Sequence, residues 1–507
     1  AIVKEAISHH SHYPDSFEPF LPEEVGAAAV AKLKEAGLTK RYDLHHDKGR
    51  AFAFVMLVDA LREDDPAHVA LWIAALSHVI ADMAACNHDP LVHTATYGWS
   101  SWDLKLAGGS AFRPVVRMLD LHASATDLAG GADAYQLAIE SQWLEDDQRD
   151  AARAMIDIML YGQEGAWYCS QRGVSILEGA SNWVAKQDPA GREQWWRNIG
   201  ELGAWAVVHT LRDLQVAIRL AEISGPVELT PEIESAFRAE VEEKIRGRKL
   251  EEDALFAPVL RPLEPQTPPS TGIVLEPTWA MNEAMLGFSA RVQAVAVART
   301  LGSQGRPYVT LHVRRLITEP FPDPKQVPLL ILVAPAFRSY HDCKAEAFDS
   351  LLANYLGQGG KLLWVGGTNR LPPKSMGAFQ EAIEKAEDAS FPVAESEFVG
   401  ATLRFGDRTW RIAHSPRTPA GWQQPFCPWR FQLDGRAGLS PLAVLETTAN
   451  ASITVGAISA DRRTACLPIY ALTPYLLEGE SVIESPAAPE LDAAGKEILM
   501  SVIDQMR

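Results

Sequence analysis

One proline-rich segment separates two kinds of sequence pattern in this 507-residue chain. Five prolines fall between Ala257 and Ser270, a composition typical of a semi-rigid linker. A chain of this length is also too long to fold around a single hydrophobic core. The sequence therefore predicts a multidomain protein, with domains over residues 1–256 and 272–507 joined by a linker over 257–271.

Before the linker, apolar residues recur at helical spacing in stretches rich in Ala, Leu and Trp. We expect helices over residues 22–36, 51–62, 66–83, 114–129, 133–144, 147–161, 164–185, 191–223 and 228–256. These stretches predict an all-α helical bundle in which polar side chains of facing helices project inward.

After the linker, short apolar runs alternate with helical stretches. Strands are expected at 273–275, 308–311, 329–333 and 361–365, with helices at 279–302 and 343–357 between them. This alternation is typical of a parallel α/β sheet. Further strands are expected at 401–405, 409–412 and 452–457, before a final helix at 490–506.

Composition narrows the function classes. The net charge of −18 argues against binding to duplex nucleic acid or to an anionic membrane. No apolar run is long enough to span a bilayer, so a soluble protein without a transmembrane segment is expected. The five cysteines are scattered and show no CxxC spacing, which argues against a disulfide framework. Eleven of the 14 histidines fall between His9 and His209, so imidazole chemistry belongs to the first domain.

Two pairs of chemically reactive residues repeat the same spacing in the first domain. His78 and Asp82 stand four apart in an expected helix, and His209 and Asp213 repeat the pair far downstream. Residues at this spacing lie one turn apart on one helical face. His88 follows six residues after Asp82, near Pro90, where the helix is expected to end.

Imidazole and carboxylate one turn apart form a half-site suited to zinc. Asp82 can bridge two metals, and His209 and Asp213 can complete a second metal's shell together with His88. The Asp43–Asp47 segment can supply an aspartate and a histidine for the first shell. Ligand type alone also admits manganese or iron. A single such pair arises often by chance, and it is the combination that predicts a polynuclear centre.

The order and spacing of these residues resemble the zinc-dependent phospholipase C superfamily, which includes the single-strand-specific zinc nucleases. Ser77–Met83 (SHVIADM) with His88, followed by His209 and Asp213, matches the shared motifs. The resemblance implies that His78 and Asp82 bind a first zinc, with Asp82 bridging to a third. It also implies that His88, His209 and Asp213 hold a second zinc.

The resemblance further implies an upstream aspartate and histidine on the first zinc. Asp43 and His46 are the residues selected, with His45 and Asp47 as close alternatives. Relatives hold the third zinc with an N-terminal tryptophan and a nearby histidine. This chain has Ala1 instead and offers the following imidazoles: His9, His10 and His12.

The second domain resembles a class I glutamine-amidotransferase-like, flavodoxin-like fold. The resemblance rests on the run Leu329–Pro335, and on Leu351–Lys361 leading into Leu362–Gly367. That family's nucleophile is a cysteine on a strained turn flanked by glycines. No such motif occurs and Cys343 lies within HDCK, so this domain is expected to be non-catalytic.

These features predict a metal-dependent hydrolase, most simply of a phosphoester, with two or three zinc ions activating water. Asp82, or Asp43 near it, is expected to orient the water as the catalytic carboxylate. The alternatives are a hydrolase of a non-phosphate ester or amide, and a metal-stabilised binding or assembly protein without turnover. The expected partner is a small-molecule or phosphoester substrate, with homo-oligomerisation possible through the second domain. The resemblance implies a periplasmic or secreted setting.

Overall fold

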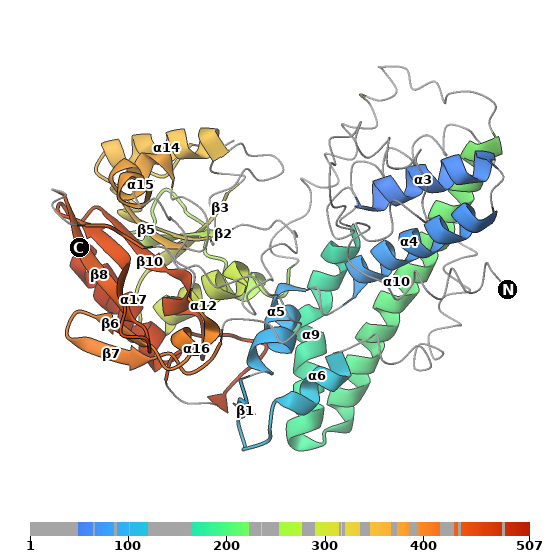
Figure 1. Ribbon diagram of the computed structural model, residues 1–507, viewed down its shortest axis with the longest axis horizontal. Coiled ribbons are helices and arrows are strands. Elements are labelled where there is room, and N and C mark those ends of the chain that lie inside the picture. Colours follow the sequence, from blue (N-terminus) through green and yellow to red (C-terminus); the bar gives the residue numbers. More distant parts are fainter. Residues whose placement is uncertain are drawn as a thin grey trace.

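The computed structural model shows the described helices of residues 49–222 on one side of the molecule and a large sheet, with further helices packed on it, on the other (Figure 1). It describes residues 49–63, 66–85, 89–100, 102–119, 164–222, 235, 253–275, 289–313, 316, 320–334, 345–366, 373–384, 393–415, 430–433, 438–478 and 482–507. We call residues 49–119 and 164–222 the helical part and residues 271–507 the sheet part. Both names refer only to the described residues within those bounds.

The helical part contains four long helices and several short elements. The long ones are α3 (Gly49–Glu63), α4 (Pro66–Ala84), α9 (Glu164–Lys186) and α10 (Pro189–Glu222). The short ones are α5 (Pro90–His93), the π-helix η2 (Thr94–Trp99), β1 (Lys105–Leu106) and α6 (Arg113–Leu119). Each long helix agrees within about two residues with its sequence-based prediction, as expected for strongly periodic segments.

Two details in the helical part differ from the prediction. Pro90 was expected to end a helix, but α4 ends at Ala84 and Pro90 instead begins α5. The side chain of Asp89 caps α5 by accepting from the N–H groups of Leu91 and Val92, and proline suits a first helical position. The short strand β1 pairs in parallel with β11 (Val482–Ile483) of the sheet part, so the helical part is not purely α.

The sheet part is built on nine strands in the order β3-β2-β4-β5-β10-β9-β8-β6-β7. Their bounds are β2 Thr271–Leu275, β3 Tyr308–His312, β4 Leu329–Val333, β5 Lys361–Gly366, β6 Thr402–Phe405, β7 Arg408–Arg411, β8 Leu439–Glu446, β9 Ser452–Ser459 and β10 Thr464–Pro468. Strands β3, β2, β4, β5 and β10 are parallel in the flavodoxin-like order. The four strands predicted to be parallel are parallel, whereas strands β9, β8, β6 and β7, whose direction was not predicted, extend the sheet antiparallel and make it mixed.

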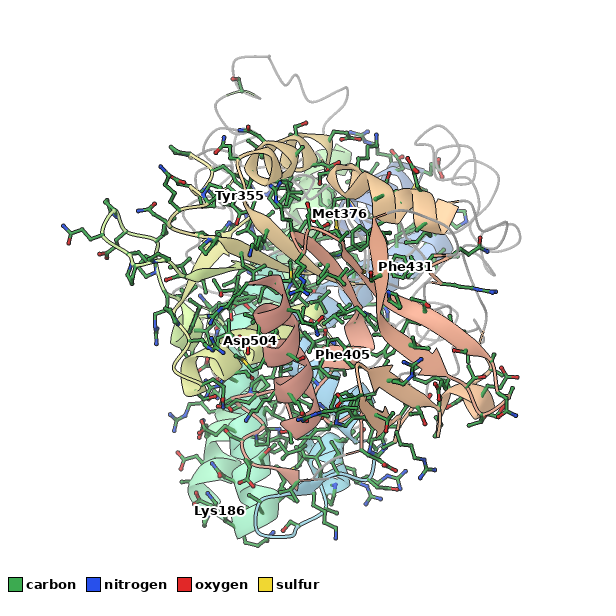
Figure 2. The ribbon with its side chains drawn as sticks, turned by 90° about the vertical axis from the view of Figure 1, so that its left-hand side faces the viewer. Lys186, Tyr355, Met376, Phe405, Phe431 and Asp504 are labelled. Atoms are coloured by element: carbon green, nitrogen blue, oxygen red, sulfur yellow. The ribbon has the colours of Figure 1, made fainter. Side chains whose placement is uncertain are left out.

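Helices cover both faces of the parallel strands. Ile331 and Leu363 face α12 (Ala290–Ser303) and α17 (Ala493–Met506), while Leu330 and Trp364 face α14 (Ala345–Gly357) and α15 (Gly377–Glu384). This alternation follows from the two-residue period of a strand. Figure 2 labels Tyr355, Met376 and Phe431 in the core on the α14 side. Four short elements complete the described fold: η6 (Ala257–Val259), η8 (Lys374–Met376), α16 (Glu395–Phe398) and η9 (Ile469–Leu472).

Two glycines, Gly359 and Gly360, end helix α14. Gly359 has a φ of +100°, which strongly favours glycine. The N–H of Gly360 donates to the carbonyl of Tyr355, as in a Schellman cap.

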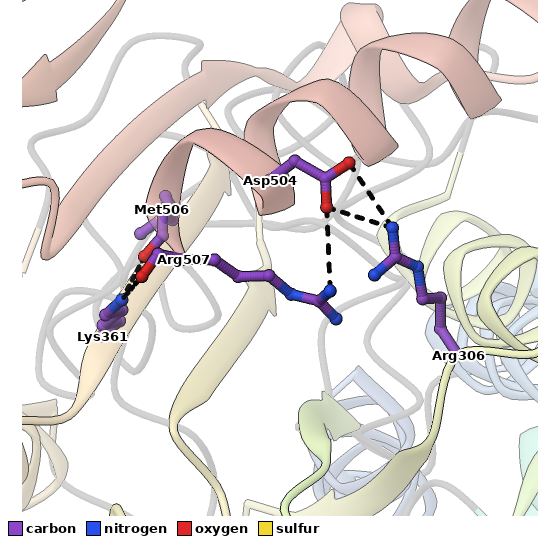
Figure 3. A network of polar contacts seen from close by, with 5 residues as sticks. All are labelled: Arg306, Lys361, Asp504, Met506 and Arg507. Carbon is purple, nitrogen blue, oxygen red and sulfur yellow. Dashed lines mark hydrogen bonds and ion pairs between the residues drawn. The ribbon is translucent and has the colours of Figure 1, made fainter.

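The C-terminal helix α17 is fixed to the sheet by charged groups (Figure 3). Asp504 accepts from Arg306 at 3.0 Å and forms an ion pair with Arg507. Lys361, at the start of β5, donates to the carbonyls of Met506 and Arg507.

The predicted linker lies along the edge of the sheet. The N–H of Thr310 on edge strand β3 donates to the carbonyl of Arg261, and the amide of Gln326 donates to Pro265. Phe256 and Val259 are buried in a hydrophobic core that α9 and α12 share. The helical and sheet parts are therefore packed together through this core.

Within the ranges described above, no helix is both long enough and apolar enough to cross a bilayer.

Candidate functional site

The downstream half-site lies on the core-facing stripe of α10. Buried positions recur along this helix at intervals of three, four and seven residues, as expected for a face packed on other helices. The stripe consists of Ile199, Leu202, His209, Asp213, Val216 and Leu220. His209 and Asp213 thus occupy positions that an ordinary helix would fill with apolar residues.

The carboxylate of Asp213 is held by an arginine from α3. Nε of Arg50 donates to Oδ2 of Asp213 at 2.8 Å, and Nη2 donates to Oδ1 at 2.8 Å. The two side chains are 3% and 0% exposed. A buried bidentate pair of this kind is strong because both partners are charged and the geometry of guanidinium and carboxylate match.

The ring of His209 is positioned by a continuous stack of side chains. Its imidazole lies on Trp205, with ring centroids 3.9 Å apart and planes inclined at 23°. Trp205 in turn stacks on Tyr168 of α9, and the guanidinium of Arg172 covers Tyr168 at 3.6 Å. Arg172 is tied back to Glu201 of α10 by an ion pair. The stack joins α9 to α10 and limits rotation of the imidazole.

Burial, aided by two nearby arginines, keeps His209 neutral. Desolvation is the largest effect, and the charges of Arg50 and Arg212 add to it, lowering the pKa of His209 to about 3. Its Nδ1 is buried and makes no hydrogen bond to any residue that the structure describes. A neutral imidazole is the form that binds metals.

The upstream half-site lies on α4, which packs against α10. Leu76, Val79 and Ile80 of α4 share a core with Val216, Ala217 and Leu220 of α10. At the other end of the contact, Sγ of Cys169 donates to the carbonyl of Ala85, and its neighbour Tyr168 stacks on Trp205.

These contacts set α4 and α10 antiparallel and bring the two half-sites to a similar level. Moving along α10 from Trp205 to His209 covers about 6 Å, at 1.5 Å per residue. Moving back along α4 from Ala85 to Asp82 and His78 covers about 5 and 10 Å in the same direction. Within these helices, His78 is half-buried with its Nε2 atom buried, whereas the side chain of Asp82 lies outside the described residues.

The other predicted ligands fall outside the described ranges: His9, His10, His12, Asp43, His45, His46, Asp47 and His88. Cys343 is also outside them. Among the residues that are described, no group of three or more His, Cys, Asp or Glu side chains is arranged to hold a metal ion.

His209 and Asp213 are residue types that bind zinc, but only one of the two side chains is free to do so. His209 is neutral and its Nδ1 has no hydrogen-bond partner within the described chain, which suits a metal ligand. Asp213 has both oxygens engaged by Arg50. A metal at this half-site therefore fits the imidazole and competes for the carboxylate.

A second group of buried charges lies where the helical and sheet parts meet, and sequence reasoning missed it. Burial raises the pKa of both Asp89 and Asp253 to about 7, while the nearby Arg291 of α12 acts in the opposite direction. We call Asp89 and Asp253 the junction carboxylates. Oδ1 of Asp253 accepts from the N–H of Leu255, but its Oδ2 makes no hydrogen bond within the described residues.

Comparisons with protein-family models, with curated proteins and with solved structures each found no match to this chain.

Proposed function

We propose that the protein is a metal-dependent hydrolase, most simply of a phosphoester, whose zinc ions are held between α4 and α10. The observation that carries the proposal is the pairing of two His-x3-Asp half-sites on antiparallel, adjoining helices at a similar level. Ligand pairs on facing helices are the usual way in which helical bundles build metal centres. The phospholipase C-like bundle and the amidotransferase-like second domain belong to the same proposal.

Zinc would supply a water of lowered pKa close to neutral pH. His78 and Asp82, with Asp43 and His46 upstream, are the proposed ligands of one ion. His88, His209 and Asp213 are the proposed ligands of the second, and a third would draw on His9, His10 or His12. The Trp205 stack fixes the ring of His209 before metal arrives, and Asp82 or Asp43 would orient the attacking water.

The charges around His209 support an anionic substrate. Arg50 and Arg212 both act on His209, and Asp213 balances one of these positive charges. Bound zinc ions would add further positive charge beside these arginines, and that charge would attract a phosphoester more than a neutral ester or amide. We propose that the protein is exported and that its substrate is a small phosphoester.

The test is metal content by plasma emission spectroscopy on protein purified without a histidine tag. We expect about two or three zinc ions per chain, as in polynuclear hydrolases, and their loss in a His78→Ala/His209→Ala double variant. Hydrolysis of bis(p-nitrophenyl) phosphate should disappear with the metal.

A matched control removes two imidazoles away from the half-sites. The His68→Ala/His312→Ala variant alters the first turn of α4 and the end of β3, and it should retain both zinc and activity. Less than about half a metal ion per wild-type chain would overturn the proposal, since a catalytic site needs stoichiometric metal.

The second candidate is a binding or assembly protein without turnover. The buried Arg50–Asp213 pair favours it, because such a pair can fix the register of packed helices with no metal present. Stoichiometric zinc without hydrolysis of any phosphoester, carboxylic ester or amide would support a metal-stabilised form of this candidate.

A further inference from the structure

Asp213 faces a cation supplied by the protein itself. The guanidinium of Arg50 donates to both oxygens of the carboxylate, and each bond is 2.8 Å long. Arg50 comes from the first turn of α3, and 163 residues separate it from Asp213 in the sequence. The contact therefore joins two helices that are far apart in the sequence.

We infer that the Arg50 guanidinium and a metal ion are alternative occupants of the Asp213 carboxylate. Arg50 thereby sets the metal affinity of the α10 half-site. This inference rests on the proposed function, since it concerns the loading of the same centre.

Geometry makes the two occupants compete. The arginine fork donates to each oxygen of the carboxylate, and a metal chelated by Asp213 would need the same two oxygens. The site is also too buried for water to screen two neighbouring cations, because Arg50 is 3% exposed and Asp213 is fully buried. A zinc ion on Asp213 would therefore repel the guanidinium as well as displace it.

The two ligands of this half-site differ in whether they must rearrange before they bind metal. The ring of His209 is already held on Trp205, and its buried Nδ1 makes no hydrogen bond within the described chain, so it needs no rearrangement to bind metal. Asp213 becomes available only in the fraction of molecules in which Arg50 has moved away. The apparent affinity is then the intrinsic affinity reduced by that fraction. The half-site would therefore be half-filled at a higher concentration of free metal than it would be without Arg50.

The experiment is calorimetric titration of chelator-treated protein with zinc, comparing the wild type with Arg50→Lys. Lysine keeps the positive charge but reaches the carboxylate as a single point contact, so one oxygen of Asp213 is left open. We expect the zinc Kd to fall by about tenfold in the variant, corresponding to roughly one bidentate contact. The matched control is Arg62→Lys, on the same helix, where the arginine donates to the carbonyl of Leu220 and does not touch Asp213.

A second readout does not depend on calorimetry. Arg50→Lys should lower the Tm of the zinc-free protein by roughly 3 °C, the shift equivalent to a tenfold change in affinity. Saturating zinc should abolish that difference, since Arg50 no longer holds Asp213 in the loaded state. An Arg50→Met variant should bind zinc more tightly still, and if it fails to fold, the lysine variant decides the question.

The outcomes separate the inference from the proposed function. Equal zinc Kd values for wild type and Arg50→Lys, or weaker binding by the variant, would overturn the inference and leave the metal centre standing. Absence of zinc binding in the wild type, Arg50→Lys and Arg62→Lys alike would overturn the proposed function and the inference with it.

Discussion

Asp213, on α10, and Asp253, just before η6, both have buried carboxyl groups, but different groups lie against them. Asp213 receives a guanidinium in bidentate geometry. Asp253 receives backbone N–H groups from Leu255 and Phe256, and its other oxygen has no hydrogen-bond partner within the described chain. Burial raises the pKa of Asp253 to about 7, beyond what these N–H donors and Arg291 offset.

The difference shows how one chain can use burial in two ways. A carboxylate paired with a guanidinium keeps its charge and links two helices, so losing one partner leaves an isolated charge in the core. A carboxylate that faces backbone dipoles and a second carboxylate can instead take up a proton. Loss of a partner should therefore be costly at Asp213, and stability should depend on pH at Asp253.

The largest effect should come from breaking the Arg50–Asp213 pair. Arg50→Met leaves the buried Asp213 carboxyl without its partner in the α3–α4–α10 core, and we expect a loss of about 3–5 kcal/mol in the free energy of unfolding. Urea denaturation of the metal-free protein measures it. The Arg50→Met/Asp213→Leu double variant removes the isolated charge and should recover most of the loss. A single-variant loss below about 1 kcal/mol would mean that the pair behaves like an exposed ion pair.

A smaller effect is expected where α9 passes the junction carboxylates. A Cβ at Gly173 would lie 2.3 Å from Cγ of Asp89, so Gly173→Ala forces the helix or the cap of α5 to shift. We expect a loss of about 1–3 kcal/mol, as for other overpacked sites.

A matched control and a rescue test this explanation. Gly200→Ala, on α10, meets no atom within 4 Å and should stabilise the helix by up to about 1 kcal/mol. Replacing Asp89 by serine keeps an N-cap with a shorter side chain, so the Asp89→Ser/Gly173→Ala variant should be more stable than Gly173→Ala alone. Equal losses at Gly173 and Gly200 would remove close approach to Asp89 as the cause.

Helical periodicity and strand alternation predicted most of the elements, but not every partner. Helix α10 was expected over 191–223 and spans Pro189–Glu222, because its apolar stripe is long and regular. Strands β8 and β10 were missed. Pro441 interrupts the first of them, and the second is only five residues long. Their pairing with β9 turns the sheet from parallel to mixed, and no local pattern encodes that pairing.

The candidate site shows the same limit. His209 and Asp213 could be selected from their spacing on one helix face, whereas Arg50 could not, since its partner is 163 residues away. Arg50 also stands in an expected helix start, where a surface arginine is ordinary. Asp253 was expected to lie in a charged helix over 228–256. Instead, residues 253–259 form turns and a short 3-10 helix, and Asp253 is 1% exposed. Both Arg50 and Asp253 are buried by segments distant in the sequence, which local patterns do not reveal.

The smallest expected effect is the change in the free energy of unfolding per pH unit that is due to the junction carboxylate Asp253. Its folded pKa of about 7 exceeds its ordinary value of 3.8, so the folded state binds more protons than the unfolded state between these values. Stability should therefore fall as pH rises from about 4 to about 7, by at most about 1.4 kcal/mol per pH unit for this carboxyl. Urea midpoints across that range measure the slope.

The variant Asp253→Asn is the control. Its side chain keeps an acceptor for the N–H of Leu255 and cannot ionise, so the stability of this variant should decline less steeply with pH than that of the wild type. Parallel slopes for the two proteins would show that Asp253 stays charged in the fold. The junction would then be neutralised by Arg291 much as Asp213 is neutralised by Arg50, and the contrast between the two sites would disappear.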